Sequence, residues 1–122
     1  MTSDDVFLKL TRQFAERFGR GHTATAYAPG RVEVLGNHTD YNEGFVLSAA
    51  INLGTCFMAA PSPDSTCRLV AGDILEEVSF DVTSRSPAAE RGWSNYVKGV
   101  SAKLHERHRA RTGFCGMFLG NL

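Results

Sequence analysis

A short stretch near the start of the chain combines turn-forming residues with many side chains that could bind a polyol or a phosphate. Residues 28–44 read APGRVEVLGNHTDYNEG. Arg31 directly follows a Pro-Gly pair, and a guanidinium is planar, always charged and able to bond two oxygens of an anion. The competing role for Arg31 is a salt bridge to a nearby carboxylate. From Gly36 to Asn42, donors and acceptors follow in close succession, which suits vicinal hydroxyls because each hydroxyl both donates and accepts a hydrogen bond.

Other chemistries fit this stretch less well. A metal site needs three or more ligands, and only His38 and Asp40 are plausible here, so we expect no metal ligand in the chain. The sequence contains no G-x-S-x-G elbow of a serine hydrolase, no Walker A motif and no Rossmann glycine fingerprint. The residue types alone therefore indicate a polar ligand such as a sugar.

The bulk composition predicts one domain and argues against two classes of partner. The chain has 122 residues and a formal net charge of zero, which argues against nucleic acid or an anionic membrane as the partner. Its three cysteines are odd in number and form no CxxC, as expected of thiols in a reducing compartment. The N-terminus, MTSDD, is acidic and lacks an apolar signal core, so we expect a cytoplasmic protein. The oligomeric state is not predicted.

The chain reads as two helices and several strands. A helix is expected over Ser3–Arg20, with its apolar face at Phe7, Leu10, Phe14 and Phe18, and a second over Asn95–Arg111, with its stripe at Val97, Val100 and Leu104. Strands are expected at Thr23–Ala28, ending in a turn at Pro29-Gly30, at a partly buried Arg31–Val34, and at Phe45–Ile51, Thr55–Ala60, Cys67–Ala71, Val78–Val82 and Phe114–Leu122.

Two of these segments resemble one known family. APGRVEVLGNHTDYNEG closely resembles the APGRVNLIGEHTDYN-G signature of the galactokinases, in the GHMP kinase superfamily. Downstream, residues 93–100 (WSNYVKGV) look like the W-x-N-Y-V-K-G segment of the same family. Two motifs in the family's order make the resemblance specific.

The resemblance implies an α+β fold of the ribosomal-protein S5 domain 2-like type, with a mixed or antiparallel sheet and helices on one face. It implies transfer of the γ-phosphoryl group of ATP to the anomeric hydroxyl of galactose, with Mg²⁺. Arg31 would lie beside the reacting oxygen as a catalytic and substrate-binding residue, and His38 and Asp40 would bind sugar hydroxyls. Trp93 and Tyr96 would border the adenine pocket; the other role for Trp93 is a core anchor.

Two positions depart from the family pattern. Glu33 stands where the family has Asn, and Asn37 stands where it has a Glu that accepts a hydrogen bond from the sugar. Asn37 loses the charge assistance of that bond, worth about 1 kcal/mol. We hypothesise that Glu33, on the same face if the segment stays extended, has taken over this carboxylate and binds substrate with Asn37. The departures leave open a kinase for another sugar, such as N-acetylgalactosamine or arabinose, or a non-catalytic galactose sensor on a kinase fold.

Family members continue past this point with a Gly- and Ser-rich phosphate loop and a later catalytic aspartate. The sequence reaches Leu122 without either. We therefore expect residues 1–122 to be an incomplete N-terminal GHMP-kinase domain that is inactive by itself.

Overall fold

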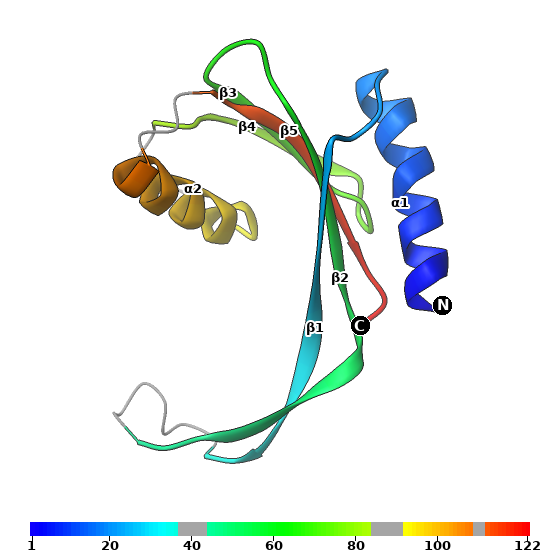
Figure 1. Ribbon diagram of the computed structural model, residues 1–122, viewed down its shortest axis with the longest axis vertical. Coiled ribbons are helices and arrows are strands. Elements are labelled where there is room, and N and C mark those ends of the chain that lie inside the picture. Colours follow the sequence, from blue (N-terminus) through cyan, green and yellow to red (C-terminus); the bar gives the residue numbers. More distant parts are fainter. Residues whose placement is uncertain (37–43, 84–91, 109–111) are drawn as a thin grey trace.

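The fold combines two helices with a five-stranded mixed sheet (Figure 1). The computed structural model describes residues 1–36, 44–83, 92–108 and 112–122. The elements, in chain order, are α1 (Ser3–Phe18), β1 (Ala24–Leu35), β2 (Leu47–Pro61), β3 (Thr66–Ala71), β4 (Glu76–Asp81), α2 (Ser94–His108) and β5 (Phe114–Gly120).

The sheet has the strand order β1-β2-β5-β3-β4. The β3–β5 pair is parallel and the other three pairs are antiparallel, which confirms the predicted α+β class and mixed sheet. The two helices lie on opposite sides of the sheet (Figure 1), so the expectation of helices on one face is wrong. Successive side chains of a strand point to opposite faces of the sheet. Because consecutive residues of β5 are apolar, this strand presents apolar side chains to both faces.

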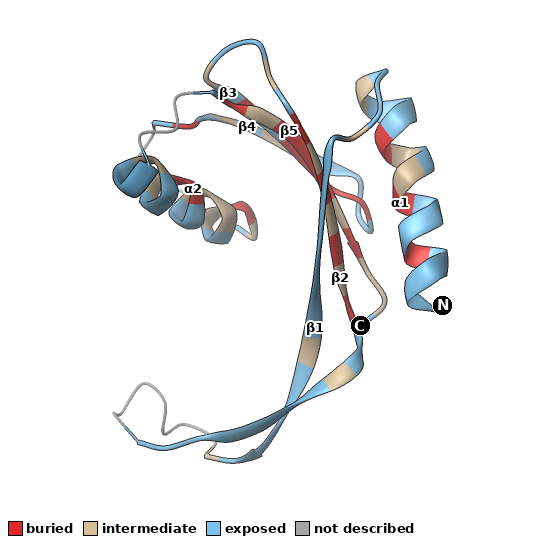
Figure 2. Ribbon diagram, in the orientation of Figure 1, coloured by how far each residue is buried: buried red, intermediate tan, exposed pale blue. Residues whose placement is uncertain are grey.

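Side chains from α1, β2, β3 and β5 form the main core. Their shared feature is burial between α1 and the sheet, which Figure 2 shows as the red segments of these elements. The cluster comprises Val6, Leu10, Phe14, Cys56, Met58, Ala60, Val70, Cys115, Met117 and Leu119. Two cysteines belong to this core and Cys67 is buried on the sheet's other face, so all three thiols are free and buried as predicted.

Helix α1 begins and ends at well-defined caps. Thr2 is the N-cap: its hydroxyl accepts from the Asp5 amide while the Asp5 carboxylate accepts from the Thr2 amide, a reciprocal capping box. Gly19 ends the helix in the left-handed conformation, with φ at 66°. The apolar face contains Val6 rather than the expected Phe7, which is 41% exposed.

The β1–β2 hairpin is longer and less interrupted than the sequence indicated. Pro29 and Gly30 lie inside β1 rather than in a turn, and β2 runs through Gly54 without ending. Pro29, Gly30 and Gly54 instead lie at an irregularity of the pairing. Between Gly54 and Ala50 strand β2 advances four residues while β1 advances two. The predicted turn and the predicted break in β2 are therefore both wrong.

The part of the hairpin that precedes Gly54 in β2 and follows Pro29 in β1 leaves the sheet as a two-stranded arm. Asn121 continues the β5 pairing by one residue, because its amide donates to the Gly54 carbonyl at 3.1 Å and its Oδ1 accepts from the Gly54 amide at 2.8 Å. Past this point and past the irregularity, residues 47–50 of β2 pair with β1. The arm curves toward the side of the sheet on which α2 lies, and most of it is exposed (Figures 1 and 2). The expected partial burial of Arg31–Val34 is thus wrong, since all four residues are exposed.

Helix α2 turns a different face to the sheet from the one predicted. Ser94 and Ser101 are its buried residues, whereas Val100 and Leu104 are 61% and 50% exposed. The small polar face packs inward, and most of the predicted apolar stripe points away from the sheet.

Acid should weaken the hydrogen bonds that the Asp81 carboxylate accepts at the end of β4. The Asp81 carboxylate accepts hydrogen bonds from the Ser65 hydroxyl at 2.6 Å and from the hydroxyl and amide of Thr83, which lower its pKa from 3.8 to about 2. A carboxylate with a lowered folded-state pKa stabilises the fold above its unfolded pKa, and that contribution is lost as pH falls through the folded value. We expect Asp81→Asn to lower the melting temperature above about pH 4 and the deficit to shrink between pH 4 and pH 2. Melting curves across this range check it, and a constant deficit would contradict it.

Candidate functional site

Arg31 and Glu33 lie together on one face of the exposed arm. They occupy a regular part of the pairing, opposite Ala50 and Ser48, so their side chains point to the same side of the strand. Within the described residues, neither Arg31 nor Glu33 makes a salt bridge. The alternative role of Arg31, a structural ion pair, is therefore not observed there, and the two side chains present a cation and an anion two residues apart.

The other proposed sugar ligands lie outside the described residues. Asn37, His38 and Asp40 fall in the segment 37–43, which joins the ends of the arm. A register shift occurs between Glu33 and Leu35, where β1 advances two residues and β2 one. The regular alternation that would carry the Glu33 face to Asn37 is interrupted there, so their shared face stays a prediction.

Trp93 lies against the sheet. Its ring meets Phe118 of β5 edge-on, with centroids 5.4 Å apart, and its Nε1 donates to the Glu76 carboxylate at 2.9 Å. The indole thereby ties the start of α2 to both β5 and β4. This arrangement matches the anchoring role weighed for Trp93 in the sequence.

Tyr96 points away from the sheet and is 82% exposed. Together with Val100, Lys103, Leu104 and Arg107 it lines an open groove of about 580 Å³ along the outer surface of α2. The residues follow at steps of three and four, so they share one helix face. A flat ring, two aliphatic side chains and two cations suit a ligand with an aromatic base and a phosphate.

The two aromatic residues that the resemblance assigns to the adenine pocket thus have different surroundings. Trp93 precedes the helix and packs inward, while Tyr96 lies in its first turn and points outward. The exposed Val100 and Leu104 were predicted, with Val97, to form the apolar stripe of this helix. The signal that could have corrected this is the small, polar character of the opposite face, at Ser94 and Ser101.

The described part of the chain offers neither a metal centre nor a membrane span. Across residues 1–36, 44–83, 92–108 and 112–122, no cluster of three or more His, Cys, Asp or Glu side chains could hold a metal ion. In the same ranges, none of the helices is long and apolar enough to cross a membrane.

Comparison with known sequences points to one family. Residues 12–61 match the galactokinase galactose-binding signature. A galactokinase from Glaesserella parasuis is 45% identical over 95 residues, covering 78% of this chain and 25% of that protein. A galactokinase from Actinobacillus pleuropneumoniae is 41% identical over 97 residues, covering 80% and 25%. The chain thus spans about a quarter of the length of these curated relatives.

Solved structures agree with the sequence comparison. The Lactococcus lactis galactokinase complexed with galactose superposes with a TM-score of 0.76 at 34% identity, covering 96% of this chain and 31% of that one. The Methanococcus jannaschii mevalonate kinase gives a TM-score of 0.68 at 16% identity, over 84% and 34% of the two chains. The second likeness shows a shared fold alone.

Proposed function

Since this chain is a homologue of the galactokinases, we propose that it forms the sugar-binding N-terminal part of an enzyme that phosphorylates galactose from ATP. One observation carries the proposal: the match to the galactose-binding signature covers the arm on which Arg31 and Glu33 lie together. Arg31 and Glu33 are neighbouring opposite charges on an exposed arm, and neither makes a salt bridge within the described residues. Such a surface is suited to binding a polar ligand.

Each residue has a proposed task. Arg31 binds the reacting sugar oxygen and stabilises the negative charge that develops on the transferred group. Glu33, His38 and Asp40 hold sugar hydroxyls, with Asn37 in place of the family glutamate. Orientation by such groups lowers the barrier because the reacting atoms are held in an attacking geometry.

ATP supplies the phosphoryl group, with Mg²⁺ neutralising its oxygens. The α2 groove fits its base: the exposed Tyr96 ring offers a stacking face, and Lys103 and Arg107 also line the groove. We assign Trp93 an indirect part, since it fixes the start of α2 against Phe118 and Glu76. A cytoplasmic location stays a prediction from the sequence.

The test is an ADP-release assay of the protein that carries this chain, with a panel of galactose, N-acetylgalactosamine and arabinose. We expect turnover with galactose, and Glu33→Gln should raise the KM for galactose by about 5- to 10-fold, the loss of one charge-assisted hydrogen bond, with the KM for ATP unchanged. Turnover with another sugar only, or galactose binding without turnover, would replace the proposal by a different kinase or by a sensor. An equal effect of Glu33→Gln on both KM values would remove Glu33 from the sugar site.

A further inference from the structure

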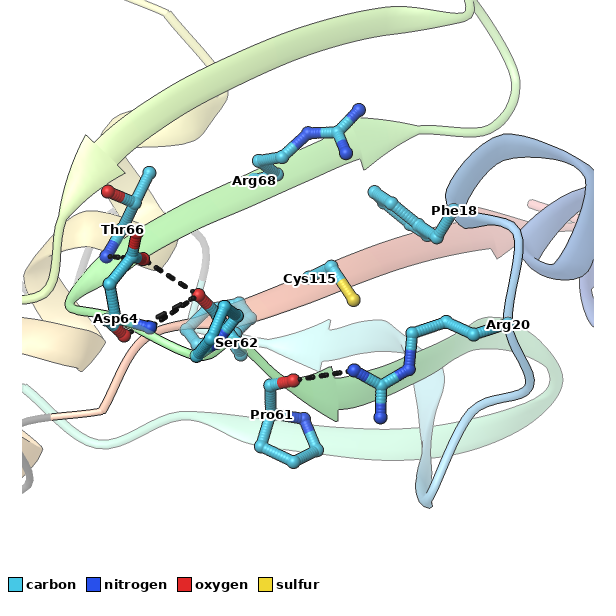
Figure 3. Close-up of a pocket in the computed structure, with 10 residues that line it drawn as sticks. Phe18, Arg20, Pro61, Ser62, Asp64, Thr66, Arg68 and Cys115 are labelled. Atoms are coloured by element: carbon cyan, nitrogen blue, oxygen red, sulfur yellow. Dashed lines mark hydrogen bonds between the residues drawn. The ribbon is translucent and has the colours of Figure 1, made fainter.

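A cavity of about 310 Å³ opens at the end of the sheet opposite the arm (Figure 3). It lies between the end of α1, the turn that follows β2, and the first residues of β3 and β5. Its apolar walls include the rings of Phe18 and Phe114 and the prolines Pro61 and Pro63. The volume is at the lower end of the range for small-molecule pockets.

Two arginines reach this cavity from different elements. Arg20 donates from one terminal nitrogen to the Pro61 carbonyl at 2.9 Å, which uses one of its five N–H donors. The Arg68 guanidinium lies over the Phe18 ring, 5.1 Å from its centroid, and donates to Glu77 at 3.0 Å. Figure 3 shows Cys115 between the two arginine side chains. Arg20 is therefore oriented by one hydrogen bond and Arg68 by a ring contact and an ion pair, and both guanidiniums keep donors for a ligand.

The charges around the cavity leave a positive excess. Glu77 is shared by Arg17, at 3.3 Å, and Arg68; burial would raise its pKa, but the two guanidiniums outweigh burial and lower it. Asp64 is held in the turn, where its Oδ1 accepts from the Thr66 amide and the Ser62 hydroxyl, both at 2.9 Å, and these bonds lower its pKa. Among the residues that line the cavity, two guanidiniums thus accompany one carboxylate, Asp64, which already accepts hydrogen bonds, and the carboxylate that bonds Arg68 is shared with Arg17.

We propose that this cavity is a binding site for a small oxyanion, a carboxylate or phosphate monoester, that carries a ring or other apolar body. Arg20 and Arg68 would bind the oxyanion, since planar guanidiniums match two oxygens at once, and the rings and prolines would cover the apolar body. The site is separate from the proposed sugar site. Arg31 pairs with Ala50, and Pro61 lies eleven residues further along β2, a distance of at most about 36 Å for an extended strand.

The test is a titration of the ¹⁵N-labelled protein that carries this chain with phenyl phosphate and with benzoate, followed by amide chemical shifts. We expect saturable shifts at Ser62, Asp64 and Cys115 with at least one anion, and none at Arg31. The neutral analogue benzyl alcohol should bind at least about 10-fold more weakly, because it cannot use the guanidiniums. The two anions together distinguish a phosphate site from a carboxylate site.

Arg20→Gln should weaken anion binding about 10-fold. It should leave the fold intact, because the side chain is exposed and makes one hydrogen bond to the chain. Arg17→Gln is the matched control: it removes the same charge from the same end of α1 but does not line the cavity. Equal losses in both variants, equal binding of benzyl alcohol, or no saturable shift with either anion would each overturn the proposal. None of these outcomes depends on whether the protein phosphorylates a sugar.

Discussion

Gly54→Ala is expected to destabilise the fold by about 2–3 kcal/mol, more than a typical single substitution does. A Cβ at this position would clash with the Ala28 carbonyl oxygen and lie 2.5 Å from the Tyr27 hydroxyl. The tyrosine can rotate, but the Ala28 oxygen belongs to the backbone of the neighbouring strand. Relief therefore requires β1 and β2 to separate where they enter the arm.

The consequence should extend beyond the glycine itself. Both backbone polar groups of Gly54 bond to Asn121, so moving β2 there also strains its contact with the end of β5. Thermal unfolding measures the effect, and a loss of this size corresponds to a melting temperature lower by roughly 8–15 °C for a domain of this length.

Gly21→Ala is the matched control for this change. A Cβ at Gly21 meets nothing within 4 Å and its backbone is not in the left-handed region, so the melting temperature should stay the same or rise slightly. Similar losses in the two variants would contradict the close approach of β1 as the reason for glycine at position 54, because a Cβ at Gly21 meets no neighbour.

Elements with a local signature were predictable from the sequence. Helix α1 has an apolar period and a terminating glycine, and β3 and β4 flank a recognisable turn, so their limits were predicted to within a few residues. The long hairpin was not predictable in the same way. Pro29-Gly30 is a strong turn signal by composition, but the long ladder between β1 and β2 accommodates it as an irregularity within one strand.

The face of α2 was mispredicted for a different reason. Apolar character at Val100 and Leu104 indicates burial only where some other surface is available to cover them, and the sheet is instead contacted by the Ser94 and Ser101 face. Local periodicity identifies the apolar stripe of α2, but it does not identify the surface that the stripe contacts. The shared side of Arg31 and Glu33, by contrast, follows from the two-residue period of a strand and required no knowledge of the tertiary structure.

Replacing Arg31 should abolish most of the proposed activity without weakening the fold. In the protein that carries this chain, Arg31→Met is expected to lower kcat/KM for galactose by about 100- to 1,000-fold, the range for removing a group that stabilises transition-state charge. The loss should fall mainly on kcat, because the guanidinium bonds most strongly to the charge that develops during transfer. Arg31→Lys should recover only part of it, since an ammonium keeps the charge but lacks the planar pair of donors.

The same variant separates catalysis from structure. Arg31 is exposed and makes no salt bridge within the described residues, so Arg31→Met should leave the melting temperature unchanged within about 2 °C. Arg12→Met, a change of the same type at an exposed position of α1, should leave both the activity and the melting temperature unchanged. A marked fall in melting temperature with little change in kcat would instead make Arg31 a structural residue of the arm. The proposed active site would then have to be built from the segment between β1 and β2.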